Sequence, residues 1–131
     1  MNNSQLSALR KIFEKIREVK LVYYFGSRAE GKAGPLSDHD FAVYLKSGSR
    51  KRRFNIRLEL MAKIGRLLKT DDVDVVILND LENTEMSYLI IANGRLIFER
   101  EPYKVLVEPR ILHEYFDYRD MLIRNKLTRA S

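Results

Sequence analysis

Two short apolar segments separated by a turn-rich loop limit the folds open to this chain. Residues 20–25 (KLVYYF) and 38–45 (DHDFAVYL) are both expected to be strands. The loop between them, GSRAEGKAGPLS, has three glycines and a proline in twelve residues. Because no helix separates these two strands, a purely parallel, doubly wound sheet is disfavoured. We therefore expect an α/β (α+β) protein with a mixed sheet.

The apolar periodicity of the other segments predicts the order α-β-β-α-β-α-β-α. Helices are expected from about residue 4 to residue 19, from 56 to 69, from 85 to 92 and over the last thirty residues, with further strands over 73–78 and 95–99. We expect about four strands with helices packed on one face, in a single domain spanning residues 1–131.

Several element boundaries are also expected from residue type. Asn3 or Ser4 can cap the first helix, and residues 46–53 (KSGSRKRR) read as a polar, basic loop. The Asn-Gly pair ending at Gly94 is typical of a left-handed helix terminus. The last helix is expected to be kinked or restarted at Pro109.

Composition excludes several classes of function. The chain of 131 residues has no cysteine, which removes disulfides, cysteine zinc sites and thiol nucleophiles. No apolar run reaches the roughly 20 residues of a membrane span, and the opening residues do not resemble a signal peptide, so we expect a cytoplasmic protein. Twenty-four Lys and Arg against 18 Asp and Glu give a net charge of +6, which favours an anionic partner.

Three carboxylates lie where strands favour apolar residues. Asp38 and Asp40 are two apart, so on a strand they project from the same face, and Asp74 interrupts the apolar run VDVVIL. Alone, Asp38 could cap a turn and Asp74 could lie at an exposed strand start. Together, clustered carboxylates are best explained by a bound hard cation, Mg²⁺ or Mn²⁺.

A small-residue turn lies at a fixed spacing from this acidic pair. Gly26 and Ser27 directly follow the first strand and can offer backbone N–H groups and a hydroxyl to phosphates. The combined pattern, from Gly26-Ser27 to Asp38 and Asp40, is GS-x10-D-x-D.

At this point the chain resembles a known family. The stretch FGSRAEGKAGPLSDHDFAVYL is similar to the signature of the DNA polymerase β-type nucleotidyltransferases, and most of all to the minimal nucleotidyltransferases, the antitoxin partners of HEPN-domain toxins. VDVVIL resembles the strand of the third carboxylate, and NGRLIFERE and FDYRDML resemble the usual end of such proteins. The P-loop, GxGxxG and HExxH patterns are absent.

The resemblance implies a role for each carboxylate. Asp38 and Asp40 would hold two divalent ions, Mg²⁺ with Mn²⁺ as an alternative, that bridge the triphosphate of ATP. Asp74 would complete the catalytic ion and help deprotonate the attacking hydroxyl, as in two-metal catalysis.

The resemblance also implies a phosphate site and a partner. Gly26 and Ser27 would position the β- and γ-phosphates, with Arg28 as a further phosphate contact or a solvated loop residue. The acceptor would be a tyrosine of an HEPN-domain RNase toxin, which receives AMP from ATP. Direct binding to nucleic acid or to a membrane is not expected.

Two other functions stay open at this stage. The chain could be a binding-only antitoxin that occludes its toxin, or a nucleotidyltransferase acting on a small hydroxylated molecule. The basic run 50–53 could attract ATP, an acidic partner or RNA, or be a solvated loop. His39 is expected to face away from the two aspartates and to be structural.

Overall fold

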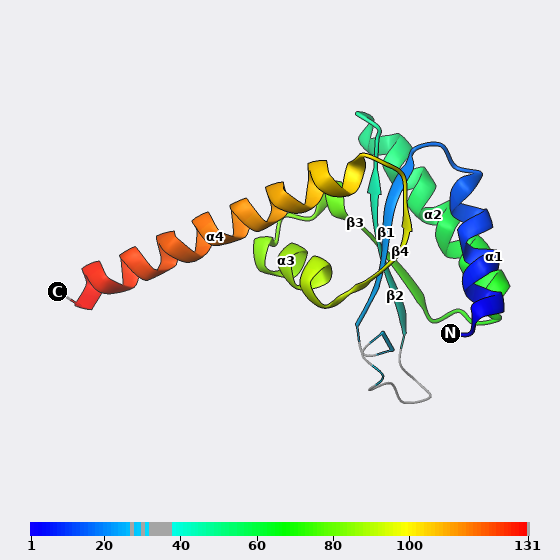
Figure 1. The fold of residues 1–131 in the computed structure, drawn as a ribbon, viewed down its shortest axis with the longest axis horizontal. Coiled ribbons are helices and arrows are strands. Elements are labelled where there is room, and N and C mark those ends of the chain that lie inside the picture. Colours follow the sequence, from blue (N-terminus) through cyan, green and yellow to red (C-terminus); the bar gives the residue numbers. More distant parts are fainter. Residues whose placement is uncertain (27, 30, 32–37, 131) are drawn as a thin grey trace.

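A four-stranded sheet forms the centre of the computed structural model, which describes residues 1–26, 28–29, 31 and 38–130, with side chains up to residue 126 (Figure 1). The strands are β1 (Val19–Phe25), β2 (His39–Leu45), β3 (Val73–Ile77) and β4 (Arg95–Glu99), in the spatial order β3-β2-β1-β4. β1 is antiparallel to β2 and β4, and β2 is parallel to β3. The mixed sheet expected from the first two strands is confirmed.

Helices cover both faces of this sheet (Figure 1). They are α1 (Asn3–Glu14), α2 (Arg50–Leu68), α3 (Thr84–Asn93) and α4 (Tyr103–Ala130), with a short 3₁₀ helix, η1, at Leu78–Asp80. α1 and α2 pack on one face, and α3 and the first half of α4 pack on the other. The order of elements is confirmed, but the expectation of helices on one face only is wrong.

The composition of β1 explains the second helical layer. Val22 and Tyr24 point to the core under α1 and α2, while Leu21 and Tyr23 point to the core under α3 and α4. All four side chains are at least 95% buried. Because a strand with apolar groups on both faces exposes one of them unless two layers cover it, LVYYF requires helices on each side.

Three expected boundaries are corrected by the structure. Asn2, one residue before the expected caps, caps α1 in a capping box with Gln5. Ser49 caps α2, so the basic run 50–53 is the first turn of a helix rather than a loop. Gly94 ends α3 with φ −74°, which is not left-handed; a Cβ at this position would collide with the carbonyl oxygen of Ile90.

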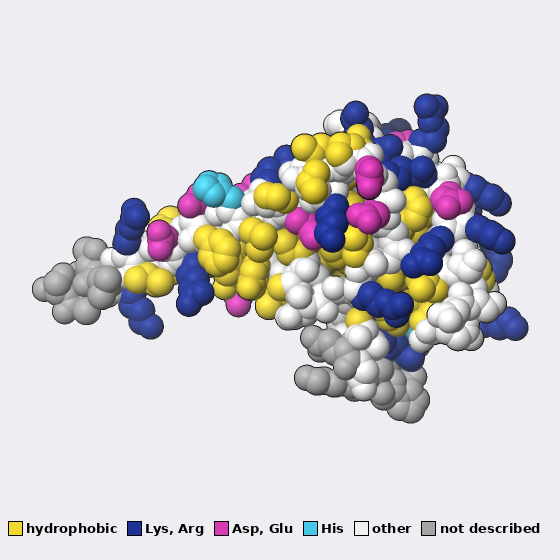
Figure 2. Space-filling view, in the orientation of Figure 1, with side chains coloured by type: hydrophobic (Ala, Val, Ile, Leu, Met, Phe, Trp, Pro, Cys, Tyr) yellow, Lys and Arg dark blue, Asp and Glu magenta, His cyan; other side chains and the backbone are white. Residues whose placement is uncertain are grey.

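The last helix continues through Pro109 without a restart and extends beyond the body of the protein (Figure 1). Its first half packs against the sheet through Val107 and Ile111. Farther along, apolar side chains are exposed; Phe116, Met121, Leu122 and Ile123 each have about half of their surface accessible. Figure 2 shows apolar side chains spread along this helix. Within the described part of the chain, no helix is long and apolar enough to cross a membrane.

Candidate active site

The two strand carboxylates lie side by side at one end of the sheet. In the parallel pair β2–β3, Asp40 is directly opposite Asp74, so both side chains project from the face that α3 and α4 cover. Asp38 lies just before β2, two residues from Asp40, and is exposed. On the other side of Asp40, the register pairs it with Phe25, the last residue of β1.

Burial and neighbouring charge act together on Asp40. The pKa of its carboxyl group is raised, mainly because the group is partly buried and further because the charges of Asp74 and Asp38 oppose its ionisation. All three carboxylates are therefore close enough to interact electrostatically. Such an arrangement disfavours the fully ionised site unless a cation neutralises it.

Gly26 lies against the Asp40 carboxylate. Its φ of +83° is the left-handed conformation that favours glycine, and an added Cβ would collide with the nearer Asp40 oxygen and lie 3.3 Å from Asp40 Cγ. The turn after β1 therefore brings backbone without a side chain directly beside the Asp40 carboxylate.

Arg57 of α2 reaches around the edge strand to Asp74, a contact that the sequence did not predict. Its Nε donates to the carbonyl oxygen of Val75 at 2.6 Å, and its Nη2 lies 3.5 Å from Asp74 Oδ1. The Asp74 side chain remains 47% exposed. A weak, partly solvated ion pair of this kind leaves the carboxylate accessible to another cation. No local signal could have identified Arg57, because the pairing depends on how α2 packs on β3.

Of the two other residues expected to contact phosphate, the structure describes only Arg28. Ser27 lies outside the described residues. Arg28 is described and half-buried. Burial lowers the pKa of His39, and the charge of Arg28 lowers it further; the same charge opposes the burial-driven rise in the pKa of Tyr24. His39 faces the α1–α2 side, where its Nδ1 lies 2.7 Å from the Tyr24 hydroxyl. A structural contact for His39 agrees with the expectation that it points away from the aspartates.

Residues 7–103 match the family described as polymerase beta, nucleotidyltransferase. The chain belongs to this nucleotidyltransferase family. The match runs from the first helix to the beginning of α4 and includes the Gly26 turn, Asp40 and Asp74. None of the curated proteins matches the chain significantly.

Solved structures with this nucleotidyltransferase fold include toxin–antitoxin complexes. A chain from a complex with AMP-PNP is 24% identical with a TM-score of 0.71, covering 97% of this chain and 99% of that chain. A chain from the tri-AMPylated Shewanella oneidensis HEPN toxin in complex with MNT antitoxin is 21% identical, with a TM-score of 0.68 and coverage of 97% and 99%. A chain from the MntA-HepT complex has the same identity and TM-score, with coverage of 96% and 99%. These likenesses show the shared fold.

The donor groups of this nucleotidyltransferase domain suit a divalent metal whose remaining ligands come from substrate. Among residues 1–26, 28–29, 31 and 38–130, no three His, Cys, Asp or Glu side chains form a group that could hold an ion. Asp40 and Asp74 supply two adjacent carboxylates instead. Mg²⁺ commonly takes one or two protein carboxylates plus substrate phosphates, so this donor set fits it.

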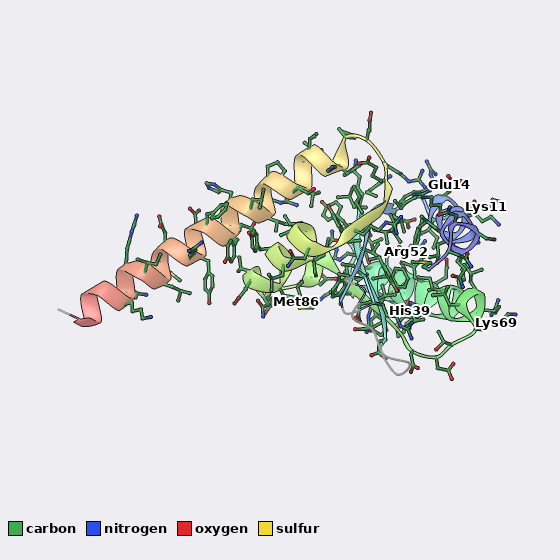
Figure 3. The ribbon with its side chains drawn as sticks, turned by 60° about the horizontal axis from the view of Figure 1, so that its bottom comes forward. Lys11, Glu14, His39, Arg52, Lys69 and Met86 are labelled. Carbon is green, nitrogen blue, oxygen red and sulfur yellow. The ribbon has the colours of Figure 1, made fainter. Side chains whose placement is uncertain are left out.

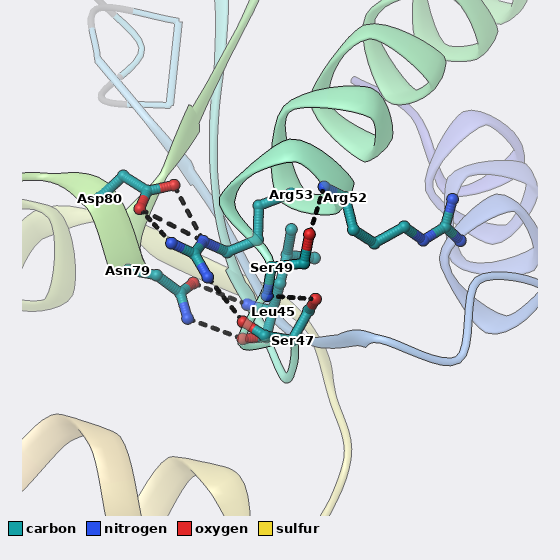
Figure 4. A network of polar contacts seen from close by, with 7 residues as sticks. All are labelled: Leu45, Ser47, Ser49, Arg52, Arg53, Asn79 and Asp80. Atoms are coloured by element: carbon teal, nitrogen blue, oxygen red, sulfur yellow. Dashed lines mark hydrogen bonds and ion pairs between the residues drawn. The ribbon is translucent and has the colours of Figure 1, made fainter.

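The basic run 50–53 makes structural contacts at the far end of β2 from Asp40 (Figure 4). Arg53 donates to both Asp80 oxygens, at 2.7 and 3.0 Å, and to the Ser47 carbonyl oxygen at 2.7 Å. These hydrogen bonds lower the pKa of the Asp80 carboxyl group. Arg52 pairs with Glu18 at 2.6 Å. Two of the four residues, Arg52 and Arg53, therefore hold the start of α2 against neighbouring segments.

Proposed function

We propose that this chain is an antitoxin that transfers AMP from Mg²⁺-bound ATP to a tyrosine hydroxyl of a partner HEPN-domain RNase toxin. One observation carries the proposal. Asp40 and Asp74 are in register beside the bare backbone of Gly26, in a chain that belongs to the nucleotidyltransferase family. The complexes of similar fold with AMP-PNP and with an AMPylated HEPN toxin suggest the nucleotide and the acceptor.

The three aspartates carry the chemistry in this proposal. Asp38, Asp40 and Asp74 would hold the metal ions, and Asp74 would also accept the proton of the attacking hydroxyl. The tyrosine oxygen bonds to the α-phosphorus while the bond from that phosphorus to the β-phosphate oxygen breaks, and pyrophosphate leaves. Bound Mg²⁺, or Mn²⁺ in its place, supplies the charge that activates the hydroxyl and stabilises the departing pyrophosphate.

The triphosphate itself is held by the turn after β1. Gly26 lets the backbone approach the β- and γ-phosphates, Ser27 contributes its hydroxyl, and Arg28 adds a positive charge. The half-buried position of Arg28 and its influence on Tyr24 and His39 put this charge at the same end of the sheet as Asp40. In this proposal the reaction takes place in the cytoplasm, where ATP is available.

A partner is needed for two reasons. The acidic pair and the Gly26 turn lie at one end of a small sheet, and the helices, apart from the outer half of α4, pack on its two cores. In this proposal a second polypeptide presents the acceptor. The outer part of α4 also exposes Phe116, Met121 and Leu122, and clustered apolar surface of this kind marks protein contacts. We propose that the HEPN partner covers this part of α4.

The same exposed surface supports a second candidate function, neutralisation by binding alone. Occlusion of the toxin needs the apolar side chains of α4 and no chemistry, and Asp74 is already paired with Arg57. In that case the chain would bind its partner without modifying it.

Incubation of the purified chain with its HEPN partner, Mg²⁺ and ATP labelled at the α-phosphate separates the two functions. We expect label on a partner tyrosine, lost with Asp40→Asn. The matched control is Asp71→Asn, an exposed aspartate in the turn before β3, which should keep the transfer. Tight binding without label on the partner would favour occlusion, and label on a small hydroxylated molecule instead of the partner would contradict the proposed acceptor.

A further inference from the structure

A polar cavity of about 430 Å³ lies at the other end of β2 from Asp40. It is formed where β2 and η1 meet the start of α2, the beginning of α3 and the first half of α4. A cavity of this size is within the range of ligand sites, roughly 300 to 1,000 Å³. The polar side chains of its wall are Tyr44, Arg53, Asn79, Ser87, Arg110 and Glu114.

Part of this wall is held in place by the protein itself. Arg53 is bonded to Asp80, and the Asn79 amide accepts from the Leu45 N–H at 2.9 Å and donates to the Leu45 carbonyl oxygen at 2.7 Å (Figure 4). Ser87 is only 8% exposed. The shape of the cavity is therefore fixed before a ligand arrives, and this lowers the entropy that binding costs.

Two further side chains of the wall, Arg110 and Glu114, are exposed and carry opposite charges. They are four residues apart on α4, yet among the described residues they form no ion pair, with each other or with another side chain. The order of arginine before glutamate is the less favourable one for such a pair along a helix. Both charges are therefore available to side chains of another molecule.

The cavity lies between the two surfaces that the proposed function gives to the partner. Tyr44 is four positions beyond Asp40 on β2, so the cavity is about 13 Å from the acidic pair along the same face. On α4, Arg110, Glu114 and Met121 are spaced by four and seven residues, which places them along one side of the helix. Figure 3 shows α4 extending away from the sheet beyond α3. A polypeptide that contacts Met121 and also reaches the acidic pair passes this cavity.

We infer that the cavity receives the segment of the partner next to the acceptor tyrosine, and that this segment has charged side chains of both signs. The inference rests on the proposed transfer of AMP to a partner tyrosine. Four extended residues span about 13 Å, so a short segment connects a tyrosine at the acidic pair with the cavity. A carboxylate of the segment binds Arg110, and a cationic side chain binds Glu114. Withdrawal from water inside the cavity strengthens both contacts.

Reversal of each charge tests this inference through the kinetics of transfer to the partner, measured with Mg²⁺ and labelled ATP. Arg110→Glu and Glu114→Arg should each raise the KM for the partner about tenfold, because each variant repels the side chain that the wild type attracts. The kcat and the affinity for AMP-PNP should stay unchanged, since neither residue contacts the acidic pair. The matched control Arg66→Glu makes the same charge change on α2, on the other face of the sheet, and should behave like the wild type.

A cross-link can locate the bound segment directly. The chain has no cysteine of its own, so Glu114→Cys can carry a single photoreactive benzophenone group. A span of 13 Å corresponds to roughly four extended or nine helical residues. On illumination of the complex, the group should therefore join the partner within about ten residues of the tyrosine that receives the label. Arg66→Cys, labelled in the same way, should not join this region.

An unchanged KM in both charge-reversed variants would overturn the inference, as would cross-links only to parts of the partner far from the labelled tyrosine. A lower kcat at unchanged KM would also contradict it, because the two residues would then act on the chemistry instead of on the partner. A wild-type chain that transfers no label would contradict the proposed function itself. Affinity for the partner then decides about the cavity: a loss in both variants would keep it as a contact of the partner, and no loss would overturn it.

Discussion

Asp40 and Asp74 are direct neighbours in the parallel β2–β3 pair, although 33 residues separate them in the chain. Their side chains share one face, and the carboxyl group of Asp40 has a raised pKa because of burial and the charges of Asp74 and Asp38. A fold that retains such repulsion at a strand end gives up stability for function, as active sites often do. The following predictions test the consequences.

Asp40→Asn should stabilise the metal-free protein. Because the pKa of Asp40 is raised in the folded state, its charged form opposes folding, and stability is lost as pH rises through the folded pKa. The variant should therefore melt at a higher temperature than the wild type at pH 7. The difference should shrink as pH falls below the ordinary value of 3.8.

Thermal melts from pH 3 to pH 8 in EDTA measure this difference. Asp71→Asn, at an exposed turn, serves as the control and should not show the same dependence on pH. A variant less stable than the wild type at pH 7 would mean that Asp40 contributes a stabilising contact instead of a repulsive one.

Gly26→Ala should abolish most of the activity. The substitution adds backbone strain at φ +83° and also pushes a methyl group into the Asp40 carboxylate. A displacement of about 1 Å can reduce a rate on the order of a hundredfold, so label transfer should fall at least that far.

Gly31→Ala is the matched control for the strain alone. Gly31 has a φ of +72° with nothing within 4 Å of an added Cβ, so its substitution should cost about 1 kcal/mol of stability and keep the transfer rate. If the two variants lose activity equally, the close approach of Gly26 to Asp40 is not what matters.

Alternation of side chains along strands made the acidic pair predictable. Asp40 and Asp74 each interrupt an apolar run, and strands β1 to β4 were anticipated to within one or two residues. Two features that sequence reasoning missed nevertheless have local signals in the chain. Both faces of the sheet are covered because β1 is apolar on each, and α2 begins at Arg50 because Ser49 caps it.

The contact that α2 makes with the site, by contrast, could not be predicted from the sequence. Arg57 is one of several basic residues in α2, and only the docking of that helix on β3 selects it for Asp74. The roles assigned to the site residues all remain predictions: Asp38, Asp40, Asp74, Gly26, Ser27 and Arg28.

Arg57→Gln should bind Mg²⁺ more tightly than the wild type. The guanidinium competes with a cation for Asp74, and a pair with this exposure is worth up to about 1 kcal/mol, or roughly fivefold in affinity. The variant should also lose about 1 kcal/mol of stability with the hydrogen bond to Val75.

Magnesium titrations in the presence of AMP-PNP and urea denaturation measure the two effects. Arg66→Gln, an exposed arginine of the same helix, should change neither. Weaker Mg²⁺ binding by Arg57→Gln would indicate that Arg57 orients Asp74 for the metal instead of competing with it.

Met121→Asp should weaken the complex with the HEPN partner. Met121 is 51% exposed on the outer part of α4, and a charge buried in an apolar contact is costly. Affinity for the partner, measured by biolayer interferometry, should fall at least about tenfold, while AMP-PNP binding stays unchanged. The control Asn125→Asp adds the same charge to an exposed polar position of α4, and equal losses in both variants would argue against apolar docking there.

The central claim is that Asp40 and Asp74 jointly hold the metal-bound triphosphate beside Gly26. A crystal structure with AMP-PNP and Mn²⁺, with anomalous scattering used to locate the metal, tests it most directly. We predict a manganese peak in contact with both carboxylates and with phosphate oxygens, and phosphates against the Gly26 backbone. Phosphates and manganese bound elsewhere, with Asp74 still paired only to Arg57, would contradict the account.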